Sequence, residues 1–390
     1  MTFSAAADES PRLPFPTNGS SVDGCFKNWE SGLLFLKPGS DAIDAGPFSH
    51  QILRGVVVWK DCPRPTMSLY LLVTIFFDSY VQRRWQVLRK NFWVGFWRLA
   101  DPKISLASFA SMFLGACLAA TALPLDWRWL GLTIAGIFAL EIAKNASGEI
   151  FDFDSGADLG VAPQDRSPFS GGKRVLVDRL LTRRETIGIA ATFYLLAILF
   201  GFFIATFRDP RVLALGMIGV TCAYFYHSPP LKLSYRGLGE VAVAVCYGPL
   251  TGAGTYLVQT GTVAAKVVWL STALGLLIGA FLWVNEFPDY SADRKSDKRT
   301  LVVRLGRKRA SYIFVFGILI SFVMLLAAPF VARLSLGVWL GLAGLPFAIF
   351  AAFRVLMAPE STTRIVPAQI ATLLAFVLVA LGAGAGALIR

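Results

Sequence analysis

The chain has 390 residues, of which 55% are hydrophobic and only 16% are charged. With a mean hydropathy of +0.59, it has too little polar surface to cover a water-soluble globule, which excludes an ordinary soluble domain. The formal net charge of +12 does not require nucleic acid as a partner, because membrane lipid head groups and an anionic substrate are sufficient.

The first 95 residues differ from the rest of the chain. They contain scattered Pro, Gly and Ser, and no signal peptide is recognisable at Met1. The apolar run 68–77 has about half of the ~20 residues that a transmembrane helix needs. Residues 80–97 mix Arg and Lys with Trp and Phe, which is typical of a helix at the cytoplasmic membrane interface. We therefore predict an N-terminal extension, 1–95, of unknown function with an interfacial helix, and a membrane domain, 96–390.

Apolar segments of about the length of a membrane span recur through the rest of the chain. We expect nine transmembrane helices, near residues 104–123, 129–146, 187–206, 212–227, 239–258, 267–285, 311–330, 335–353 and 366–388. The predicted fold class is therefore all-α, a polytopic membrane bundle. Most Lys and Arg of the loops follow the second, fourth, sixth and eighth spans. Because cytoplasmic loops are rich in Lys and Arg, we expect these loops and the N-terminus inside and Arg390 outside.

An acidic cluster lies at the end of the second predicted span. Asn145, Glu149 and Asp152 are spaced at i, i+4 and i+7, so that a helix presents them on one face, and Asp158 follows. Carboxylates stacked in this way repel one another unless a cation lies between them. Hard oxygen ligands favour magnesium or calcium over softer metals. A solvated acidic helix end is the alternative interpretation.

The sixth predicted span ends in a second cluster of the same kind. Its polar residues step by four and again share a helix face: Asn285, Asp289, Asp293 and Asp297. Two such clusters, each beside a membrane span, favour metal binding over two solvated helix ends. We expect them to face each other across a pseudo-symmetric pocket, with coincidence as the alternative.

A basic loop follows each cluster. Gly171-Gly172-Lys173-Arg174 comes after the first and Lys298-Arg299 after the second. Paired glycines let backbone amides approach an anion, and Lys or Arg donates charge-assisted hydrogen bonds to phosphate oxygens. Magnesium at the acidic residues, together with these cations, would bind a diphosphate. Basic cytoplasmic loops can also be only a topology signal.

The loop after the fourth span contains Pro229-Pro230, which breaks the helix at the membrane surface. Residues beside the break, including Tyr226 and Lys232, are free to line the mouth of a cavity. His227 has no neighbours in sequence that complete a metal site. The sequence therefore favours a hydrogen-bonded histidine over a metal ligand or a base.

These motifs resemble those of the UbiA superfamily of intramembrane prenyltransferases. In the first stretch, Asp152 and Asp158 match Asp positions of the family's Asp-rich motif, while Glu149 replaces the usual Asp and Gly148 the usual Asn. The second stretch matches at three positions: Asn285, Asp289 and Asp293. The resemblance extends from about Trp97 to the C-terminus. The loops are most similar to those of 1,4-dihydroxy-2-naphthoate prenyltransferases of menaquinone synthesis.

The resemblance implies a bundle around a central cavity, in which Mg2+ helps a prenyl diphosphate to ionise and an electron-rich, small aromatic acceptor attacks the allylic cation. The implied metal ligands are Asn145, Glu149, Asp152, Asp158, Asn285, Asp289 and Asp293. The implied catalytic residues are Asp152, Asp289, Lys173 and Arg174. The implied substrate-binding residues are Lys173, Arg174, Tyr226, Lys232, Lys298 and Arg299. We expect such an enzyme in a bacterial inner membrane, with its active site at the cytoplasmic face.

Three alternatives remain open at this point. A transporter would place acids at the bilayer midplane, whereas most acids here lie beyond the span ends. Glu141 is the exception, and we expect it to pair with Lys144. Gly148 leaves room for a non-catalytic member of the superfamily. A non-aromatic lipid or sugar-phosphate acceptor would also suit the same donor site.

Overall fold

The computed structural model describes residues 43–45, 48–53, 56–59 and 91–389, and the chain divides into two compact units, Met1–Gln82 and Arg83–Arg390. The described part of the first unit is an antiparallel sheet of three strands, β1 (Ile43–Ala45), β2 (Phe48–Leu53) and β3 (Val56–Trp59), in the order β1-β2-β3. These strands were not predicted, although Val56-Val-Val-Trp59 is rich in strand-forming residues. The predicted segments 68–77 and 80–90 lie outside the described residues.

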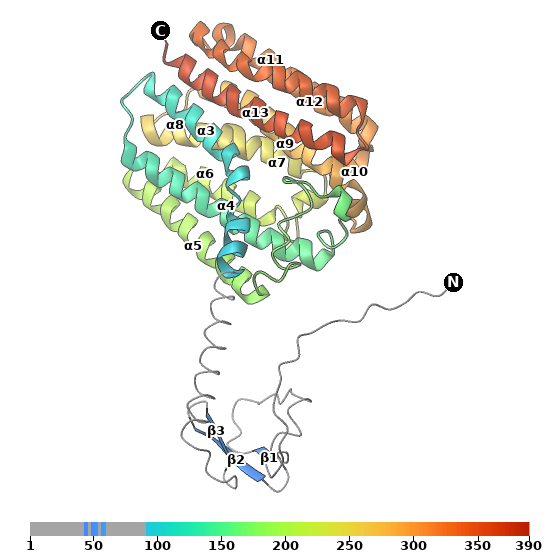
Figure 1. Ribbon diagram of the computed structural model, residues 1–390. Helices are drawn as coiled ribbons and strands as arrows, with labels where there is room; N and C mark the ends of the chain where they lie inside the picture. Colours follow the sequence, from blue (N-terminus) through green and yellow to red (C-terminus); the bar gives the residue numbers. More distant parts are fainter. Residues whose placement is uncertain (1–42, 46–47, 54–55, 60–90, 390) are drawn as a thin grey trace, which may run out of the picture. The chain divides into compact units, whose positions relative to one another are not determined.

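The described part of the second unit is helical, which confirms the all-α prediction for the membrane domain (Figure 1). Residues 91–100 are helical and lead through Asp101 into the next helix. The α-helices are α3 (Pro102–Ala120), α4 (Trp127–Ser155), α5 (Arg183–Phe207), α6 (Arg211–Phe225), α7 (Gly239–Val245), α8 (Thr251–Thr260), α9 (Ala265–Lys295), α10 (Leu301–Leu305), α11 (Arg307–Val331), α12 (Leu345–Met357) and α13 (Thr362–Ala387). Shorter helical turns are η1 (Pro163–Asp165), η2 (Leu233–Tyr235), η3 (Cys246–Leu250) and η4 (Leu336–Gly344).

Among the described residues, 8 helical segments are long and apolar enough to cross a membrane. They correspond to every predicted span except 212–227, which is the 15-residue helix α6. At 1.5 Å per residue α6 extends over about 22 Å, less than the ~30 Å hydrocarbon core of a bilayer. Eight of the nine predicted spans are therefore found among the described residues, and the ninth, α6, is an apolar helix shorter than a full span.

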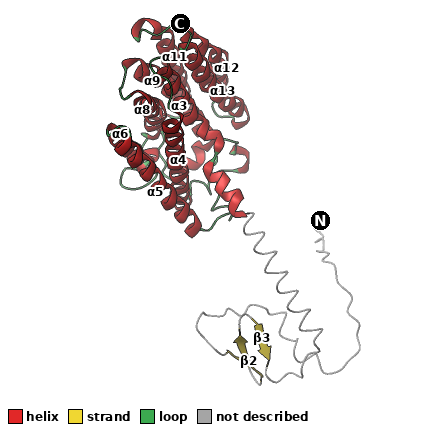
Figure 2. Ribbon diagram, turned by 90° about the vertical axis from the view of Figure 1, so that its left-hand side faces the viewer, coloured by secondary structure: helices red, strands yellow, loops and turns green. Residues whose placement is uncertain are grey.

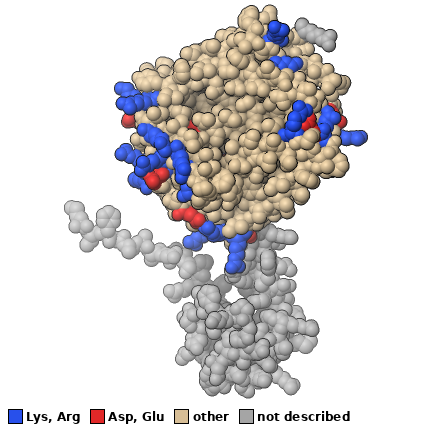
Figure 3. Space-filling model, turned by 180° about the vertical axis from the view of Figure 1, so that it is seen from behind, with Lys and Arg blue, Asp and Glu red and all other residues tan. Residues whose placement is uncertain are grey.

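Figures 1 and 2 show α3 and α9 inside the bundle, with α5 and α6 on one side and α11 and α12 on the other. The burial of the helices agrees with this arrangement. In the most apolar stretch of α9, 72% is buried inside the protein, compared with 22% in that of α5. The outer helices expose large apolar side chains such as Phe202 and Phe316. Figure 3 shows a wide uncharged surface between separate groups of Lys and Arg. An apolar outer surface of this kind suits contact with lipid.

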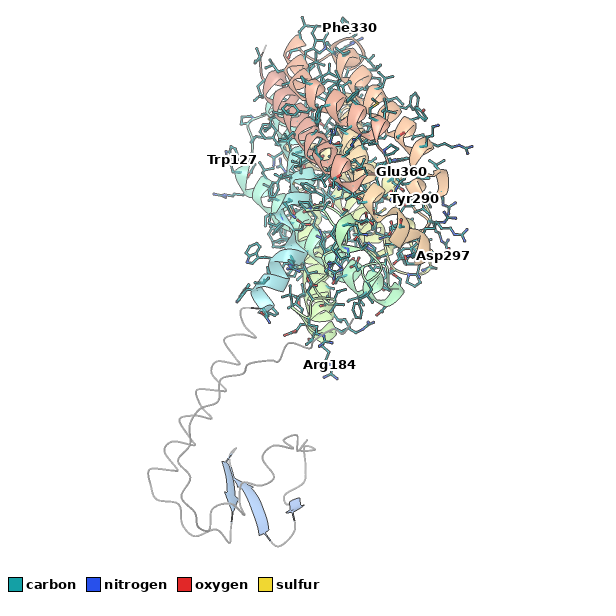
Figure 4. The ribbon with its side chains drawn as sticks, turned by 45° about the vertical axis from the view of Figure 1, so that its right-hand side comes forward. Trp127, Arg184, Tyr290, Asp297, Phe330 and Glu360 are labelled. Carbon is teal, nitrogen blue, oxygen red and sulfur yellow. The ribbon has the colours of Figure 1, made fainter. Side chains whose placement is uncertain are left out.

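The helical conformation of α4 and α9 continues beyond their apolar segments, to Ser155 and Lys295. Asn145, Glu149 and Asp152 therefore stand on α4, and Asn285, Asp289 and Asp293 stand on α9, as their spacing predicted. The prediction that Asp297 shares this helix face is wrong, because α9 ends before it and its φ of 56° is left-handed. Figure 4 shows Trp127 and Phe330 towards one end of the bundle and Arg184 and Asp297 towards the other. The ends of α4 and α9 that carry acidic residues thus belong to the end of the bundle that holds Asp297.

A break in the helix between α7 and α8 shapes the interior. Pro249 interrupts the hydrogen-bond pattern within η3, and Gly248 has non-helical backbone angles. A Cβ on Gly248 would lie 2.6 Å from the Cα of Gly275 on α9, so only glycine permits this close approach. The carbonyl of Tyr247 accepts a hydrogen bond from the Ser111 hydroxyl instead of from its own helix. The break thereby fixes Tyr247, whose ring lines a cavity described below.

Candidate active site

A cavity of about 1020 Å³ lies between the two helices that carry the acidic clusters. Most of the residues predicted from the sequence line it: Asn145, Glu149, Asp152, Asp158, Lys173, Arg174, Tyr226, Asn285, Asp289, Asp293 and Lys298. The two clusters, far apart in sequence, therefore face one cavity. This is the pocket that the repeated pattern predicted.

Lys298 links the two clusters. Its Nζ lies 3.3 Å from Oδ2 of Asp152 on α4 and 3.9 Å from Oδ1 of Asp293 on α9. Burial alone would lower the pKa of Lys298, but the surrounding carboxylates, first Asp152 and then Asp293, raise it well above its ordinary value. The ammonium group is therefore charged and balances part of the negative charge of both clusters.

Besides Lys298, the first cluster has neutral hydrogen-bond partners. Asp152 Oδ1 accepts a hydrogen bond of 2.7 Å from the Tyr235 hydroxyl. Glu149 Oε1 accepts one of 2.7 Å from the backbone N–H of Leu176. Asn145 donates its side-chain amide to the Leu99 carbonyl at 2.8 Å. These contacts fix the three side chains, and they tie α4 to the segments before α3 and before α5.

The paired glycines of the basic loop contact both clusters. The N–H of Gly171 donates to Asp289 Oδ2 at 3.1 Å. Gly172 has a φ of 74°, and a Cβ there would lie 2.1 Å from Asp158 Oδ1. Burial, with the nearby Asp152 and Glu149, raises the pKa of Asp158 to about 8. The Gly171-Gly172 backbone therefore packs closely on acidic side chains at the place where we predicted it to approach an anion.

Both cations after the paired glycines have partners. Lys173 forms an ion pair with Asp101, which ends the helical segment 91–100 and has a left-handed φ of 39°. Arg174 donates to the Asp158 carbonyl at 2.9 Å and lies 3.4 Å from Asp178. Sequence reasoning did not identify Asp101, because nothing local to Asp101 shows that it contacts a loop far along the chain.

Two predicted substrate-binding residues, Lys232 and Arg299, do not line the cavity in the described part of the chain. The Lys232 ammonium lies 5.2 Å from the centre of the Tyr235 ring. Arg299 is exposed and pairs with Asp297, Nε to Oδ1, at 2.7 Å. Both side chains therefore lie outside the cavity. Their neighbours contact a residue that lines it: Lys298, next to Arg299 in the sequence, and Tyr235, next to the Lys232 ammonium group, both contact Asp152.

His227 has a position that the sequence did not reveal. Its ring lies against Gly148, and its Nε2 is 3.5 Å from Asp152 Oδ2. Burial lowers the pKa of His227 to about 4, so the ring is neutral at pH 7. Among the described residues its Nδ1 has no hydrogen-bond partner. The sequence favoured a hydrogen-bonded histidine over a metal ligand or a base; in the described part of the structure only Nε2 has a polar neighbour, and the ring forms part of the cavity wall.

The arrangement fits a cation that arrives with a phosphate-bearing ligand. Within the described residues, no three acidic, histidine or cysteine side chains are grouped closely enough to hold a metal by themselves. Among the residues predicted as metal ligands, three have a buried oxygen without a hydrogen-bond partner in the described part of the chain: Glu149 Oε2, Asn285 Oδ1 and Asp289 Oδ1. Mg2+ usually binds one or two protein carboxylates and completes its shell with water and substrate phosphates. The available oxygens therefore suit Mg2+ bridged by a diphosphate.

The fold and the cavity define the class: a polytopic membrane protein with an acid-lined polar cavity at one end of an apolar helical bundle. A model of the UbiA prenyltransferase family matches residues 108–371. The chain belongs to this family, and it is an integral membrane prenyltransferase.

Similar proteins agree with this assignment. The 1,4-dihydroxy-2-naphthoate octaprenyltransferase of Mycobacterium tuberculosis is 31% identical over 262 residues, covering 65% of this chain and 83% of that protein. The apo structure of a UbiA homolog from Aeropyrum pernix K1 covers 71% of this chain and 96% of its own, at 17% identity and a TM-score of 0.52. A UbiA homolog from Archaeoglobus fulgidus bound to GPP and Mg2+ covers 75% and 99%, at 14% identity and a TM-score of 0.50. These likenesses support the fold.

Proposed function

We propose that this prenyltransferase transfers a polyprenyl group from a prenyl diphosphate to a small hydroxylated aromatic acceptor of the 1,4-dihydroxy-2-naphthoate type, with Mg2+. The observation that carries the proposal is that acidic clusters from α4 and α9 face one cavity and share Lys298. The name of the Mycobacterium tuberculosis relative supports the acceptor class. The Mg2+ and prenyl diphosphate of the Archaeoglobus fulgidus homolog support the donor and the metal.

The polar end of the cavity would bind the diphosphate. Asn285, Asp289 and Glu149 offer unpartnered oxygens for the cation, and Asp152, Asp158, Asn145 and Asp293 complete the acidic wall. Bound Mg2+ would neutralise the leaving diphosphate as a Lewis acid. Lys173, Arg174 and Lys298 would donate charge-assisted hydrogen bonds to its oxygens.

The apolar part of the cavity would bind the isoprenoid. Phe169 and Phe281 line it with their ring centres 5.5 Å apart. The negative faces of such rings stabilise a nearby cation, here the allylic carbon from which the diphosphate departs. Trp93 and Trp97 line the same cavity yet are 56% and 55% exposed. A long prenyl chain would leave the cavity between these two side chains and continue into lipid.

The proposal extends to location and domain organisation. Lys and Arg are concentrated in the loops that follow the acidic clusters, and such loops lie in the cytoplasm of membrane proteins. We place the active site at the cytoplasmic face of a bacterial inner membrane. The sequence predicted that the catalytic domain starts near residue 96. Because Trp93 lines the cavity and the second compact unit is Arg83–Arg390, we propose that the domain starts before Trp93.

Turnover by the full chain in lipid nanodiscs tests the function. Farnesyl and longer diphosphates would be combined with hydroxylated naphthoates, benzoates, and lipid or sugar phosphates, with Mg2+ or with a chelator. We expect Mg2+-dependent prenylation of naphthoates. Asp152→Asn should lower kcat by about 100-fold or more, because a charge that stabilises the departing group is lost.

The matched control is Asp154→Asn. Asp154 is on the same helix but outside the cavity, where it pairs with Arg183 at 2.8 Å in an exposed position. This variant should retain its activity. Turnover that is unchanged by the chelator, or equal rates in the Asp152 and Asp154 variants, would contradict the metal assignment. Transfer only to lipid or sugar phosphates would contradict the proposed acceptor class.

A further inference from the structure

A second cavity adjoins the main one. It has a volume of about 190 Å³ and lies among α4, α5, α6, α7 and α8. Its wall is apolar and rich in glycine, with contributions from Gly136, Gly201, Gly216, Gly219 and Gly254. Four residues line both cavities: Lys144, Tyr226, Val243 and Tyr247. These four residues, which we call the partition, separate the inner cavity from the acid-lined one.

Among the described residues, one carboxylate in the inner cavity lacks a hydrogen bond of normal geometry, although the hydroxyls of Ser105, Ser108 and Tyr247 lie near it. Glu141 lines this cavity and is only 5% exposed. Within the described part of the chain, neither of its side-chain oxygens has a hydrogen-bond partner. An unpartnered buried carboxylate is unfavourable, and a ligand that donates hydrogen bonds would remove the penalty.

Lys144 does not supply that partner. The sequence predicted an ion pair between Glu141 and Lys144, but the described residues contain no such pair, and Lys144 Nζ instead lies 3.2 Å from the Tyr247 hydroxyl. It also lies 5.7 Å from the centre of the Tyr226 ring and 5.5 Å from that of Tyr247. A buried carboxylate and a buried ammonium group therefore stand at i and i+3 on one helix face, each available to a ligand.

We propose that the inner cavity is the acceptor subsite, in which Glu141 accepts a hydrogen bond from a ring hydroxyl and Lys144 binds a neighbouring carboxylate on the same ring. The inference rests on the proposed function, because it names the group that binds the acceptor. Residues at i and i+3 have Cβ atoms about 5–6 Å apart, a separation that suits adjacent substituents of one aromatic ring. The Tyr226 and Tyr247 rings of the partition would pack against that ring.

The size of the inner cavity favours the acceptor over the prenyl chain. A volume of 190 Å³ lies below the ~300–1,000 Å³ of pockets that hold drug-sized ligands. It is enough for one or two fused rings and too small for a polyprenyl tail. Since Lys144, Tyr226 and Tyr247 also line the main cavity, a ring held at the partition would be adjacent to the donor.

Equilibrium binding tests the subsite without turnover. Protein in nanodiscs, loaded with Mg2+ and an unreactive prenyl thiolodiphosphate, would be titrated with 1-hydroxy-2-naphthoate and with 2-naphthoate, which lacks the hydroxyl. Glu141→Gln should weaken binding of the hydroxylated ligand by about 10-fold or more, as expected for the loss of one buried hydrogen bond. Binding of 2-naphthoate should change by less than about twofold, whereas Lys144→Gln should weaken both ligands.

The control variant is Glu360→Gln, at an exposed glutamate between α12 and α13 (Figure 4). It should bind both ligands as the unmodified protein does. Equal binding of 1-hydroxy-2-naphthoate by Glu141→Gln and by the control would overturn the inference. A loss of thiolodiphosphate affinity in Glu141→Gln that grows with prenyl chain length would also overturn it, because the cavity would then hold the tail.

Cysteine protection gives a second readout that needs no variant. Cys222 and Cys246 line the inner cavity, and Cys117 is buried elsewhere. 1-Hydroxy-2-naphthoate should slow alkylation of Cys222 and Cys246 by a small apolar maleimide, relative to Cys117. Unchanged alkylation at saturating ligand would overturn the inference. If Glu141-dependent binding and protection occur but naphthoates are never prenylated, the subsite stands and the proposed function fails.

Discussion

Gly148 on α4 and His227 after α6 share one small space: a Cβ on Gly148 would lie 2.6 Å from Cε1 of the His227 ring. The two residues are distant in the sequence, and the ring reaches within 3.5 Å of Asp152 from outside the motif. Position 148 is where the UbiA superfamily usually has Asn. The imidazole therefore fills the volume that a side chain at this motif position would take.

The first prediction follows from this contact. From the sequence alone, Gly148→Asn restores the usual residue and should be tolerated, whereas the structure predicts overpacking. We expect the free energy of unfolding to fall by about 1–3 kcal/mol, with weaker binding of the prenyl thiolodiphosphate. The double variant Gly148→Asn with His227→Ala should recover part of both losses. Thermal unfolding in nanodiscs measures the effect, and a Gly148→Asn protein as stable as the unmodified one would contradict the contact.

The second prediction concerns pH. Burial lowers the pKa of His227 from 6.5 to about 4, so the unfolded chain binds this proton more readily than the folded one. The contribution of neutral His227 to the free energy of unfolding is complete above pH 6.5 and is lost as the pH falls from 6.5 towards 4. The unfolding temperature should therefore drop between pH 7 and pH 5 by more in the unmodified protein than in His227→Asn. Equal drops in the two proteins would show that His227 is not the group responsible.

The third prediction uses two glycines with almost the same backbone conformation. Gly172 has a φ of 74° and would place a Cβ 2.1 Å from Asp158, whereas Gly156 has a φ of 78° and open space around it. Gly156→Ala should cost only the left-handed strain, about 1–2 kcal/mol. Gly172→Ala adds the clash and should also weaken thiolodiphosphate binding. Thermal unfolding and binding titrations distinguish the two, and identical results for both alanines would exclude the close packing on Asp158.

The fourth prediction compares neighbouring cations. Lys298→Met removes the buried ammonium between Asp152 and Asp293 and should destabilise the metal-free protein by about 3–5 kcal/mol, because buried carboxylates lose their counter-charge. Arg299→Met is the control, since its exposed pair with Asp297 is worth about 0–1 kcal/mol. Unfolding in the presence of a chelator measures both changes. A stable Lys298→Met protein would show that the carboxylates do not need this charge.

The features that could be predicted from the sequence are those set by local periodicity. Apolar length identified the spans, and the four-residue steps through Asn145 and Asn285 placed each cluster on one helix face. The rest depends on contacts between distant segments. Nothing near His227 points to Gly148, and nothing near Arg299 shows that Asp297 holds it in solvent. Glu141 and Lys144 are one turn apart, yet Lys144 contacts Tyr247 beside the break at Pro249, and Glu141 has no hydrogen-bond partner in the part of the chain that the structure describes.

The position of Lys298 determines the charge that a metal ion would meet between the two acidic clusters. Its ammonium group lies between the carboxylates of α4 and α9 and reduces the electrostatic repulsion between the two helices. A divalent cation held by these carboxylates would join a positive charge that the protein already places there. The same ammonium group would then be available to donate hydrogen bonds to phosphate oxygens bound beside the cation.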